Sequence, residues 1–450
     1  MSEVKKIKPA LSKGTRDFLP VEVAKRNYIF DIIKGVFRKY GFEEIETPAI
    51  ERMETLTGKY GEEGDKLLFK ILNSGDFLKD VPKDELTTAN SGAVLKHIAE
   101  KGLRYDLTVP LARYVVQHQE NLAFPFKRFH IGPVWRADRP QKGRYQEFYQ
   151  CDADVIGSES LLNEVELTMI YAEVFKQLGM DVTIRVNNRK LIDEILKLVD
   201  VADKKSEVII LVDKWDKMEW TGEKGIAVQL TTLGLTEAQV DKLYQLLSTI
   251  NTSNFATNSV ADDVAKEVET VMQFFNEDSK VLFDAKLMRG LDYYTGTIWE
   301  VKANNVQMGS LGGGGRYDNL TEMFGAKNMS GVGISFGIER IYDVMEELNL
   351  FPPAVSQGVK VLFVPREKEM ETFAFQQAQI LRNQGIGAEV YLGNVKKQKH
   401  FKYIEDKKIA YSVEVGNDEI STQKFRLRVT YTRDTQSDLG IQDIVAIMLR

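Results

Sequence analysis

Hydrophobic residues recur with helical spacing near the start of the chain. In the stretch EVAKRNYIFDIIKGVFRKY, residues 22–40, they fall on one helical face, and Gly41 follows as a stop signal. The face comprises Tyr28, Ile29, Ile32, Ile33, Val36, Phe37 and Tyr40. The next stretch, FEEIETPAIE, is strand-like, and Pro48 limits it to a sheet edge or a strand end. The pattern alone fits either packing within one chain or a dimer interface.

Strand and loop patterns alternate between residues 104 and 185. Two strand candidates, FKRFHIGPVWRAD and YQEFYQCDADVIG, are separated by the basic, glycine-containing loop RPQKGR. This short connection favours a hairpin over a crossover, and therefore an antiparallel sheet. A helix, SLLNEVELTMIYAEVFKQLG, closes the block at Gly179.

The pattern changes to helical over residues 189–278. The runs RKLIDEILKLVDV, TEAQVDKLYQLLSTI and VADDVAKEVETVMQFF have helical periodicity, and few strand candidates separate them. Strand-like sequence resumes at KLMRGLDYYTG, so we interpret the helical stretch as an insertion.

A second change follows the proline-containing stretch NLFPPAVSQG at 349–358. Strand candidates VKVLFVP, IGAEVYLG and IAYSVEVG then alternate with helix candidates METFAFQQAQILRNQG and KKQKHFKYIEDKK. This alternation predicts a small α/β domain.

Composition narrows the class of protein. The 450 residues suffice for two or three domains, and 43% apolar with 28% charged residues is typical of a soluble globular chain. A net charge of -6 does not favour nucleic-acid binding by the whole molecule, so any polyanion must meet local basic patches. Cys151 is the single cysteine, which excludes an intrachain disulfide and fits a reducing compartment. We find no signal-peptide-like start and no membrane-length apolar run, and we therefore expect a cytoplasmic protein without membrane contact.

Several well-known motifs are absent or incomplete. The chain contains no P-loop motif, and GVGISFG at 331–337 has Phe336 where a dinucleotide-binding fingerprint requires glycine. The four histidines lack metalloprotease spacing, so we expect no metal site. The stretch GISFG makes Ser335 a formal hydrolase nucleophile, but the only later histidine is His400, which we expect on a solvated basic helix. A hydrolase is therefore disfavoured.

The remaining candidate chemistry rests on arginines and polar aromatic residues. The stretch VWRADRPQKGR places Arg136, Arg139, Lys142 and Arg144 on the predicted hairpin, where guanidinium groups can bind phosphate or carboxylate through paired hydrogen bonds. A solvated charged loop is the alternative. The glycine run LGGGGRYDN allows either close approach to a ligand or a structural turn, and Arg340 in GIERIYDVM can equally form a salt bridge. The stretch LMRGLDYYTGTIWEV predicts a polar ligand, because each buried polar group in it requires a partner.

These stretches together resemble the class II aminoacyl-tRNA synthetases, and specifically the histidyl-tRNA synthetase family. The resemblance runs in the family's order over nearly the whole chain, and RGLDYY is its most specific motif. The matching stretches are KGTRDFLP at 13–20, LRYDLTVPLARY at 103–114, VWRADRPQKGRYQEFYQCDADVIG at 134–157, LMRGLDYYTGT at 287–297, GGGRYDNL at 313–320 and GISFGIERI at 333–341.

The resemblance implies an α+β fold with a six-stranded antiparallel catalytic sheet and flanking helices. It divides the chain into catalytic residues 1–188 and 279–350, a helical insertion domain at 189–278, a linker at 351–358 and an anticodon-binding α/β domain at 359–450. It also implies a homodimer formed partly by the first helix and the strand ending at Pro48.

The implied activity is ATP-dependent attachment of histidine to its tRNA. The histidine carboxylate attacks the α-phosphate and releases pyrophosphate, and a terminal ribose hydroxyl of the tRNA then attacks the adenylate. By match to the family, Arg289 bridges the histidine carboxylate and the α-phosphate, where it neutralises developing charge.

The resemblance also implies a histidine pocket. Tyr294 and Asp154 hydrogen-bond the two imidazole nitrogens, and Tyr293 and Gln150 line the same pocket. Asp106 and Thr108 receive the α-amino group. A pocket that satisfies both ring nitrogens rejects other amino acids, because its buried polar groups then lose their partners.

On the ATP side, Arg136 matches the family's α-phosphate arginine, and Arg144 reaches the terminal phosphates. Phe148 and Arg340 sandwich the adenine. Magnesium accompanies the β- and γ-phosphates as a counter-ion without a protein cage. Asp138 departs from the class pattern, in which glutamate is common, and this leaves recognition of the adenine amino group in doubt.

For tRNA, the resemblance implies acceptor-end contacts from Arg139 and Gln141. In the C-terminal domain, KKQKHFKYIEDKK and KFRLR offer local positive charge for RNA, or a solvated face. The main rival is the regulatory subunit of ATP phosphoribosyltransferase, which shares the catalytic fold but lacks the anticodon domain. Residues 359–450 and the intact RGLDYY argue against it.

Overall fold

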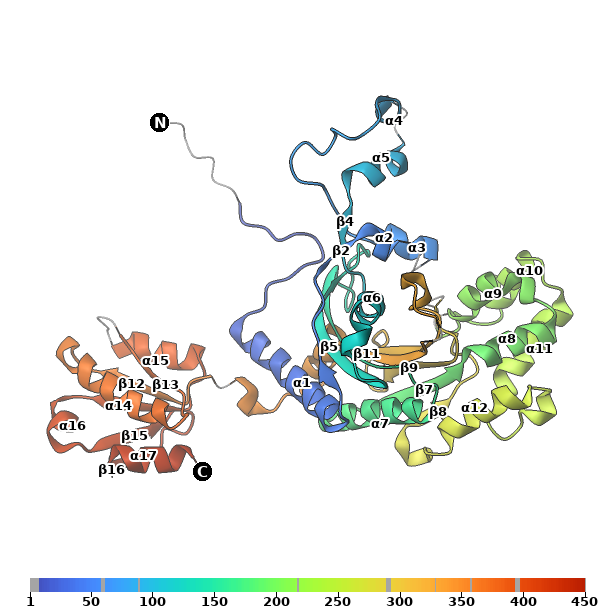
Figure 1. Cartoon of the computed structure of the whole chain (residues 1–450). Coiled ribbons are helices and arrows are strands. Elements are labelled where there is room, and N and C mark those ends of the chain that lie inside the picture. The colour runs from blue at the N-terminus through green and yellow to red at the C-terminus, as the bar shows by residue number, and fades with distance from the viewer. Residues whose placement is uncertain are drawn as a thin grey trace. The chain divides into compact units, whose positions relative to one another are not determined.

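The computed structural model describes most of the chain, which forms two compact units. The described residues are 8–57, 61–87, 90–216, 218–288, 293–327, 329–356, 358–392 and 397–449. The first unit comprises Met1–Phe18 and Arg26–Leu350, and the second comprises Leu19–Lys25 and Phe351–Arg450. Figure 1 labels most of the helices and strands.

An eight-stranded sheet forms the centre of the first unit. Its strand order is β1 (Glu43–Glu44), β5 (Phe126–Trp135), β6 (Glu147–Ile156), β11 (Gly331–Gly337), β10 (Gly312–Tyr317), β9 (Thr297–Ala303), β7 (Val182–Asn188) and β8 (Val281–Phe283). The six strands from β5 to β7 are antiparallel, as predicted. The short strands β1 and β8 add one parallel strand at each edge. The predicted hairpin is confirmed, because β5 and β6 pair along their whole length.

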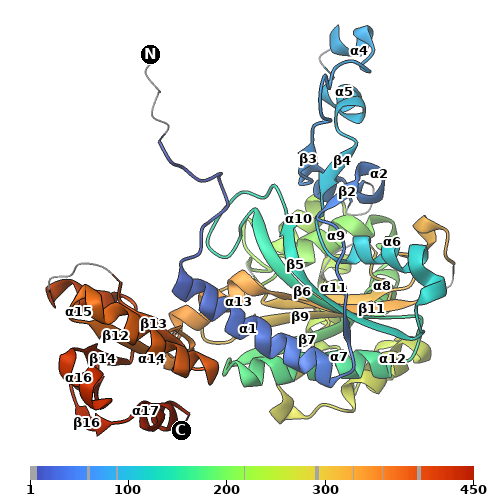
Figure 2. The ribbon, with the colours of Figure 1, turned by 60° about the vertical axis from the view of Figure 1, so that its left-hand side comes forward.

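One face of this sheet is apolar and covered by helices. Alternate side chains in a strand point to the same face, which places Phe129, Cys151 and Phe336 together. The ring of Phe37 on α1 (Pro20–Lys39) lies 5.3 Å from that of Phe129, and Tyr171 on α7 (Leu162–Gln177) lies 4.8 Å from Phe336. Helix α13 (Ile338–Glu347) packs against β6, and Figure 2 shows α1 and α7 along the same face. Burial of each such aromatic ring contributes on the order of 1.5–3 kcal/mol.

The predicted strand around Pro48 is wrong in its extent. The chain forms two short strands, β1 and β2 (Ile50–Arg52), which belong to different sheets. Pro48 lies between them, because proline cannot donate a ladder hydrogen bond. Strand β2 starts a three-stranded sheet with β4 (Lys101–Leu103) and β3 (Lys70–Ile71). The neighbouring helices are α2 (Met53–Leu56), α3 (Gly61–Lys66), α4 (Lys83–Thr87), α5 (Ser91–Ile98) and α6 (Thr108–His118).

The three predicted helices after residue 189 are confirmed as α8 (Arg189–Val199), α11 (Glu237–Thr249) and α12 (Asp262–Met272). The structure adds α9 (Lys205–Val212) and α10 (Ile226–Thr232), which were not predicted, and the five helices gather near β7 and β8 in Figure 1. Helix α11 begins at a capping box in which Thr236 and Gln239 exchange hydrogen bonds. Helix α8 buries Leu191, Ile195 and Val199 in a shared core. These helices belong to the first unit.

The second unit contains a five-stranded mixed sheet, which confirms the predicted α/β pattern. Its order is β13 (Ala388–Val390), β12 (Val361–Pro365), β14 (Tyr411–Val415), β15 (Phe425–Val429) and β16 (Thr435–Leu439). The first three strands are parallel, and the last two add an antiparallel hairpin. The helices are α14 (Glu371–Asn383), α15 (Lys397–Asp406), α16 (Asn417–Thr422) and α17 (Ile441–Met448).

Short 3₁₀ helices connect some of these elements: Gln119–Asn121, Ala202–Lys204, Ala256–Asn258, Glu277–Ser279, Glu322–Phe324, Pro353–Ser356 and Lys368–Met370. Among the described residues, no helix combines the length and apolar character needed to span a bilayer.

Candidate active site

The second face of the large sheet carries polar side chains, four of which are buried and two partly exposed. We call this group the polar floor: Arg128 and His130 on β5, Gln150, Asp152 and Asp154 on β6, and Ser335 on β11. The strand register places Arg128 opposite Asp154, His130 opposite Asp152, and Asp152 opposite Ser335. Because each strand contributes alternate residues, all six share one face. The floor includes the predicted pocket residues Gln150 and Asp154.

Asp154 is held by two neighbours. The Arg128 guanidinium lies 2.7 Å from its Oδ2 atom, and the Tyr317 hydroxyl donates a hydrogen bond to its Oδ1 atom. Burial raises the pKa of Asp154, while Arg128 and the Tyr317 hydrogen bond oppose that shift. The carboxylate is therefore a preformed acceptor within the floor.

Asp152 and His130 have strongly shifted pKa values. Burial raises the pKa of Asp152 to about 7, although Arg128 opposes the shift. Burial, with help from Arg128 and Arg104, lowers the pKa of His130 to about 3. His130 is therefore neutral at physiological pH, whereas Asp152 titrates close to neutrality.

Glycines make room for two predicted pocket residues. A Cβ atom on Gly333 would lie 1.9 Å from Asp154 Oδ1, and one on Gly315 would lie 2.5 Å from the Tyr294 ring. The stretch LGGGGRYDN was expected to form a turn or to approach a ligand with its backbone. The turn is wrong, because residues 312–317 form β10, paired on both sides, and the Tyr294 ring covers Gly315. Close approach of this backbone to a ligand stays a prediction.

The two tyrosines of the RGLDYY motif lie together beside this floor. The rings of Tyr293 and Tyr294 meet edge to face at 4.9 Å, and Tyr293 lies 6.2 Å from Tyr317. Since Tyr317 hydrogen-bonds Asp154, the rings of Tyr293 and Tyr294 lie close to one end of the floor. Arg289, the predicted catalytic residue, lies outside the described residues.

Asp106 and Thr108 lie at the N-terminus of α6. Asp106 is buried, and its Oδ1 atom accepts a hydrogen bond of 3.1 Å from the Val109 backbone N–H. Arg128 donates to the Leu107 carbonyl at 3.3 Å, which ties this segment to the floor. Asp106 also raises the pKa values of Asp152 and Asp154, which places all three carboxyl groups in one electrostatic environment.

Arg136 and Phe148 lie together at the hairpin end of β5 and β6. The Arg136 guanidinium stacks at 4.1 Å over Tyr105 and at 5.1 Å over Phe148, and its Nε donates to the Tyr105 carbonyl at 3.0 Å. These contacts fix a positive charge beside an aromatic face next to the floor.

Two further predicted arginine sites meet at the loop between β5 and β6. Arg144 lies on the loop, and Arg340 reaches it from α13. Arg144 pairs with Asp138 at 2.8 Å, and Arg340 donates to the Gly143 carbonyl at 2.7 Å. Arg340 also donates to the Ser310 carbonyl at 2.8 Å, and it therefore holds this loop near α13. Arg139 and Gln141 are exposed on the same loop.

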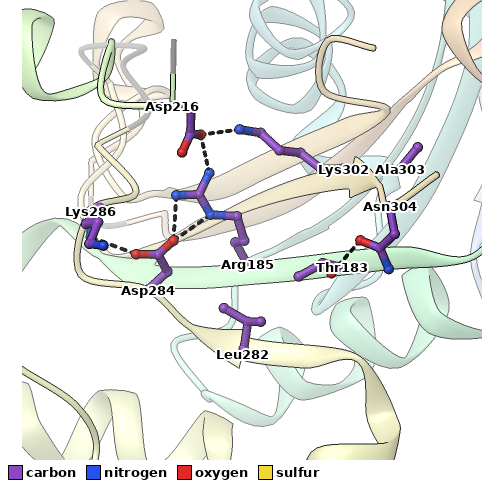
Figure 3. Close-up of a pocket in the computed structure, with 9 residues that line it drawn as sticks. All are labelled: Thr183, Arg185, Asp216, Leu282, Asp284, Lys286, Lys302, Ala303 and Asn304. Atoms are coloured by element: carbon purple, nitrogen blue, oxygen red, sulfur yellow. Dashed lines mark hydrogen bonds and ion pairs between the residues drawn. The ribbon is translucent and has the colours of Figure 1, made fainter. Parts of the chain in front are cut away.

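A separate cavity of about 430 Å³ lies at the β7–β8 edge (Figure 3). Arg185 lies at its centre and pairs with Asp216 at 2.6 Å, Asp284 at 2.5 Å and Glu300 at 2.9 Å. Lys302 also pairs with Asp216. This network ties the segment after α9 to the sheet, and none of the predicted site residues lines the cavity.

Sequence reasoning missed Arg128, His130 and Asp152 as site residues. Polar residues alternate with apolar ones in FKRFHIG and FYQCDAD, and this pattern could have indicated a polar sheet face. His400 was expected on a solvated helix, but it is buried on α15, so that expectation is wrong. Ser335 accepts a hydrogen bond from Gln150, and no hydrogen bond to a histidine is found for it in the described chain. This arrangement does not favour the hydrolase alternative.

Comparison with known proteins identifies the family. The family model described as histidyl-tRNA synthetase matches residues 14–78 and 99–341, and the model for the anticodon binding domain matches residues 359–450. The chain is 48% identical over 438 residues to the histidine–tRNA ligase of Christiangramia forsetii, covering 94% of this chain and 95% of that protein. It is 45% identical over 454 residues to the histidine–tRNA ligase of Phocaeicola vulgatus, covering 98% and 99%.

Solved structures agree with this result. The crystal structure of histidyl-tRNA synthetase from Nostoc sp. PCC 7120 is similar with a TM-score of 0.81 and 26% identity, covering 99% of this chain and 100% of that one. An ATP phosphoribosyltransferase regulatory subunit/histidyl-tRNA synthetase from Bacillus halodurans C shares the fold at a TM-score of 0.69 and 20% identity, covering 89% and 97%. The fold, the polar floor and these matches lead to one conclusion: the chain belongs to the histidyl-tRNA synthetase family.

Proposed function

We propose that this chain activates histidine with ATP on the polar floor and then transfers it to the 3' end of its tRNA. Membership of the family, with relatives at 45–48% identity over nearly the whole chain, makes it an ATP-dependent histidine–tRNA ligase. The observation that carries the site assignment is that Phe148, Gln150 and Asp154 share one face of β6. Arg136 stacks on Phe148 at the hairpin end of that face, and the Tyr294 ring lies against Gly315.

The histidine side chain would bind between Asp154 and Tyr294, with Tyr293 and Gln150 completing the pocket. Asp154 is suited to accept an imidazole N–H, because Arg128 and Tyr317 already fix its orientation. Asp106 and Thr108 would receive the α-ammonium group, where the buried carboxyl of Asp106 offers charge complementarity.

ATP would bind across the hairpin end. Arg136 would contact the α-phosphate, and Phe148 and Arg340 would enclose the adenine. Arg144 would reach the terminal phosphates, which requires it to leave Asp138. Asp138 would then face the adenine side of the site with its carboxylate free. Magnesium would enter with the β- and γ-phosphates as part of the substrate.

Arg289 would act when the histidine carboxylate attacks the α-phosphate. Two anionic groups meet in this step, and a guanidinium that binds both of them lowers the electrostatic part of the barrier. The motif position of Arg289 supports this role, because Tyr293 and Tyr294 of the same motif lie beside the floor.

Recognition of tRNA would involve both units. Arg139 and Gln141 are exposed on the hairpin loop and would meet the acceptor end. Residues 359–450 would bind the anticodon as one domain, following catalytic residues 1–188 and 279–350, the helical insertion at 189–278 and the linker at 351–358. We further propose a cytoplasmic homodimer formed through α1 and the region of Pro48, where neighbouring Ile50 is 50% exposed.

Charging of tRNA tests the overall function. The full chain, supplied with ATP, magnesium and labelled histidine, should transfer label to histidine tRNA and to no other tRNA. Folded protein that binds histidine but charges no tRNA would contradict the proposal and would favour a regulatory role.

A further inference from the structure

A row of three neighbouring side chains links β6 and β11 within the polar floor. The Gln150 Nε2 group donates to the Ser335 Oγ atom at 2.8 Å. Ser335 lies opposite Asp152 in the strand register, and its hydroxyl opposes the rise in the pKa of that carboxyl. The row therefore runs from Gln150 through Ser335 to Asp152.

The chemistry of the three groups sets the direction of this row. An amide nitrogen only donates, so Ser335 Oγ must accept from Gln150 and can give its single proton to Asp152. An ionised Asp152 only accepts, which completes the sequence of donors. If the Gln150 amide were reversed, its carbonyl oxygen would face the Ser335 hydroxyl. That oxygen and an ionised Asp152 would then both need the single Ser335 proton, unless Asp152 were protonated. An ionised Asp152 consequently fixes which end of the Gln150 amide faces Ser335.

The other end of the Gln150 amide is its carbonyl oxygen. Gln150 Oε1 is buried and has no hydrogen-bond partner within the described part of the chain. A buried acceptor of this kind carries a desolvation cost of about 1–3 kcal/mol, which a bound N–H donor would remove. The row therefore presents an unpaired acceptor on the same face of β6 as Asp154.

Ser335 itself is held firmly from the opposite side of the sheet. The Tyr171 hydroxyl donates to the Ser335 carbonyl at 3.0 Å, and the Ser335 backbone N–H donates to the Tyr171 hydroxyl oxygen at 3.3 Å. Tyr171 is fully buried on α7. The position of the Ser335 hydroxyl is thus set by the fold, as a positioning role requires.

We propose that Asp152 and Ser335 are positioning residues, which hold the Gln150 amide so that its carbonyl oxygen accepts an N–H group of the bound histidine. The proposal rests on the proposed function and deepens it. It also gives Ser335 of the GISFG stretch a role other than that of a nucleophile.

The charge of Asp152 depends on all the groups that face it. Arg128 on β5 favours the ionised form, while Asp154 on β6 and Asp106 before α6 oppose it. His130 on β5, its second register partner, stays neutral. Protonation of Asp152 would let the row reverse, so amino-acid binding should weaken as this group gains its proton.

The test is histidine-dependent ATP–pyrophosphate exchange by the full chain. Ser335→Ala should raise KM for histidine about 10-fold with KM for ATP unchanged, because one orienting hydrogen bond is lost. Ser335→Thr keeps the hydroxyl and should restore KM to within about 2-fold of the wild type. Ser412→Ala, a buried serine change on β14, serves as the matched control and should leave KM for histidine unchanged.

A combination of variants separates positioning from general loss of structure. In a Gln150→Ala background, Ser335→Ala should have no further effect on KM for histidine, because the amide that it orients is absent. Asp152→Asn should remove the part of the pH dependence of KM that the wild type shows near neutrality. If Ser335→Ala does not fold, Asp152→Asn alone decides through this pH profile.

The outcomes distinguish failure of the positioning role from failure of the proposed function. Equal KM values in wild type and Ser335→Ala, or equal effects of Ser335→Ala with and without Gln150, would overturn the positioning role. An unchanged pH profile in Asp152→Asn would do the same. Absence of histidine-dependent exchange in the wild type would instead contradict the proposed function.

Discussion

The guanidinium of Arg128 lies 2.7 Å from the carboxylate of Asp154, and their side chains are 0% and 3% exposed. The pair joins β5 to β6 beneath the proposed histidine pocket. Each charge is buried, so each depends on the other for its stability inside the protein. This ion pair therefore links the stability of the sheet to the orientation of Asp154 in the proposed pocket.

Loss of Arg128 should destabilise the protein strongly. We expect Arg128→Met to lower the free energy of unfolding by about 3–5 kcal/mol, because it leaves the Asp154 charge buried without its partner. Arg128→Met with Asp154→Leu should recover part of this loss, because both charges are then absent. Urea unfolding of the three proteins measures these changes.

An exposed arginine provides the control for that measurement. Arg52 pairs with Glu54 at 2.9 Å, with side chains 74% and 66% exposed, so Arg52→Met should change stability by less than about 1 kcal/mol. A similar small loss for Arg128→Met would show that the buried pair has little structural importance.

Asp152 should make the folded protein less stable as pH rises. Its pKa is raised from 3.8 to about 7, so between these values the folded chain keeps a proton that the unfolded chain has lost. The free energy of unfolding falls across this window as pH rises. Asp152→Asn removes the titration and should gain stability relative to the wild type from about pH 4 to 7, by at most about 1.4 kcal/mol per pH unit.

His130 should change the free energy of unfolding with pH in the direction opposite to Asp152. Its pKa is lowered from 6.5 to about 3, so its contribution to stability is lost as pH falls through that window. His130→Gln should therefore gain stability relative to the wild type as pH falls. Unfolding midpoints over the same pH range test both variants, and parallel curves for all three proteins would refute the assigned shifts.

Arg289 is expected to be essential for adenylation but not for folding. Arg289→Ala should slow ATP–pyrophosphate exchange about 10²–10³-fold, since the residue would act on charge that develops in the transition state. Its thermal unfolding should match that of the wild type, and Arg52→Ala should retain full exchange. Wild-type exchange rates in Arg289→Ala would remove it from the catalytic assignment.

The C-terminal unit should matter for tRNA charging more than for histidine activation. Deletion of residues 359–450 should spare pyrophosphate exchange and reduce charging at least about 10-fold. Arg426→Glu, on the basic strand β15, offers the same test in a full-length chain through reversed local charge. Equal loss of exchange and charging in both variants would indicate a structural effect instead of RNA recognition.

The sequence predicted the antiparallel hairpin, because period-two patterns are visible in short stretches. The pocket roles of Gln150 and Asp154 come from the resemblance and stay predictions, and the structure places both residues on one face of β6. It did not predict the role of Arg128, whose partner becomes visible only when β5 and β6 pair in register. Gly315 was misread for a physical reason. A glycine run signals a turn locally, yet here the missing side chain makes room for the ring of Tyr294 in a paired strand.

The most direct test of the account is ATP–pyrophosphate exchange by the wild-type chain with each standard amino acid in turn, without tRNA. We expect exchange with histidine alone, because only the two ring nitrogens of histidine satisfy the acceptors and donors proposed around Asp154 and Tyr294. Exchange with another amino acid, or none from folded protein, would contradict it.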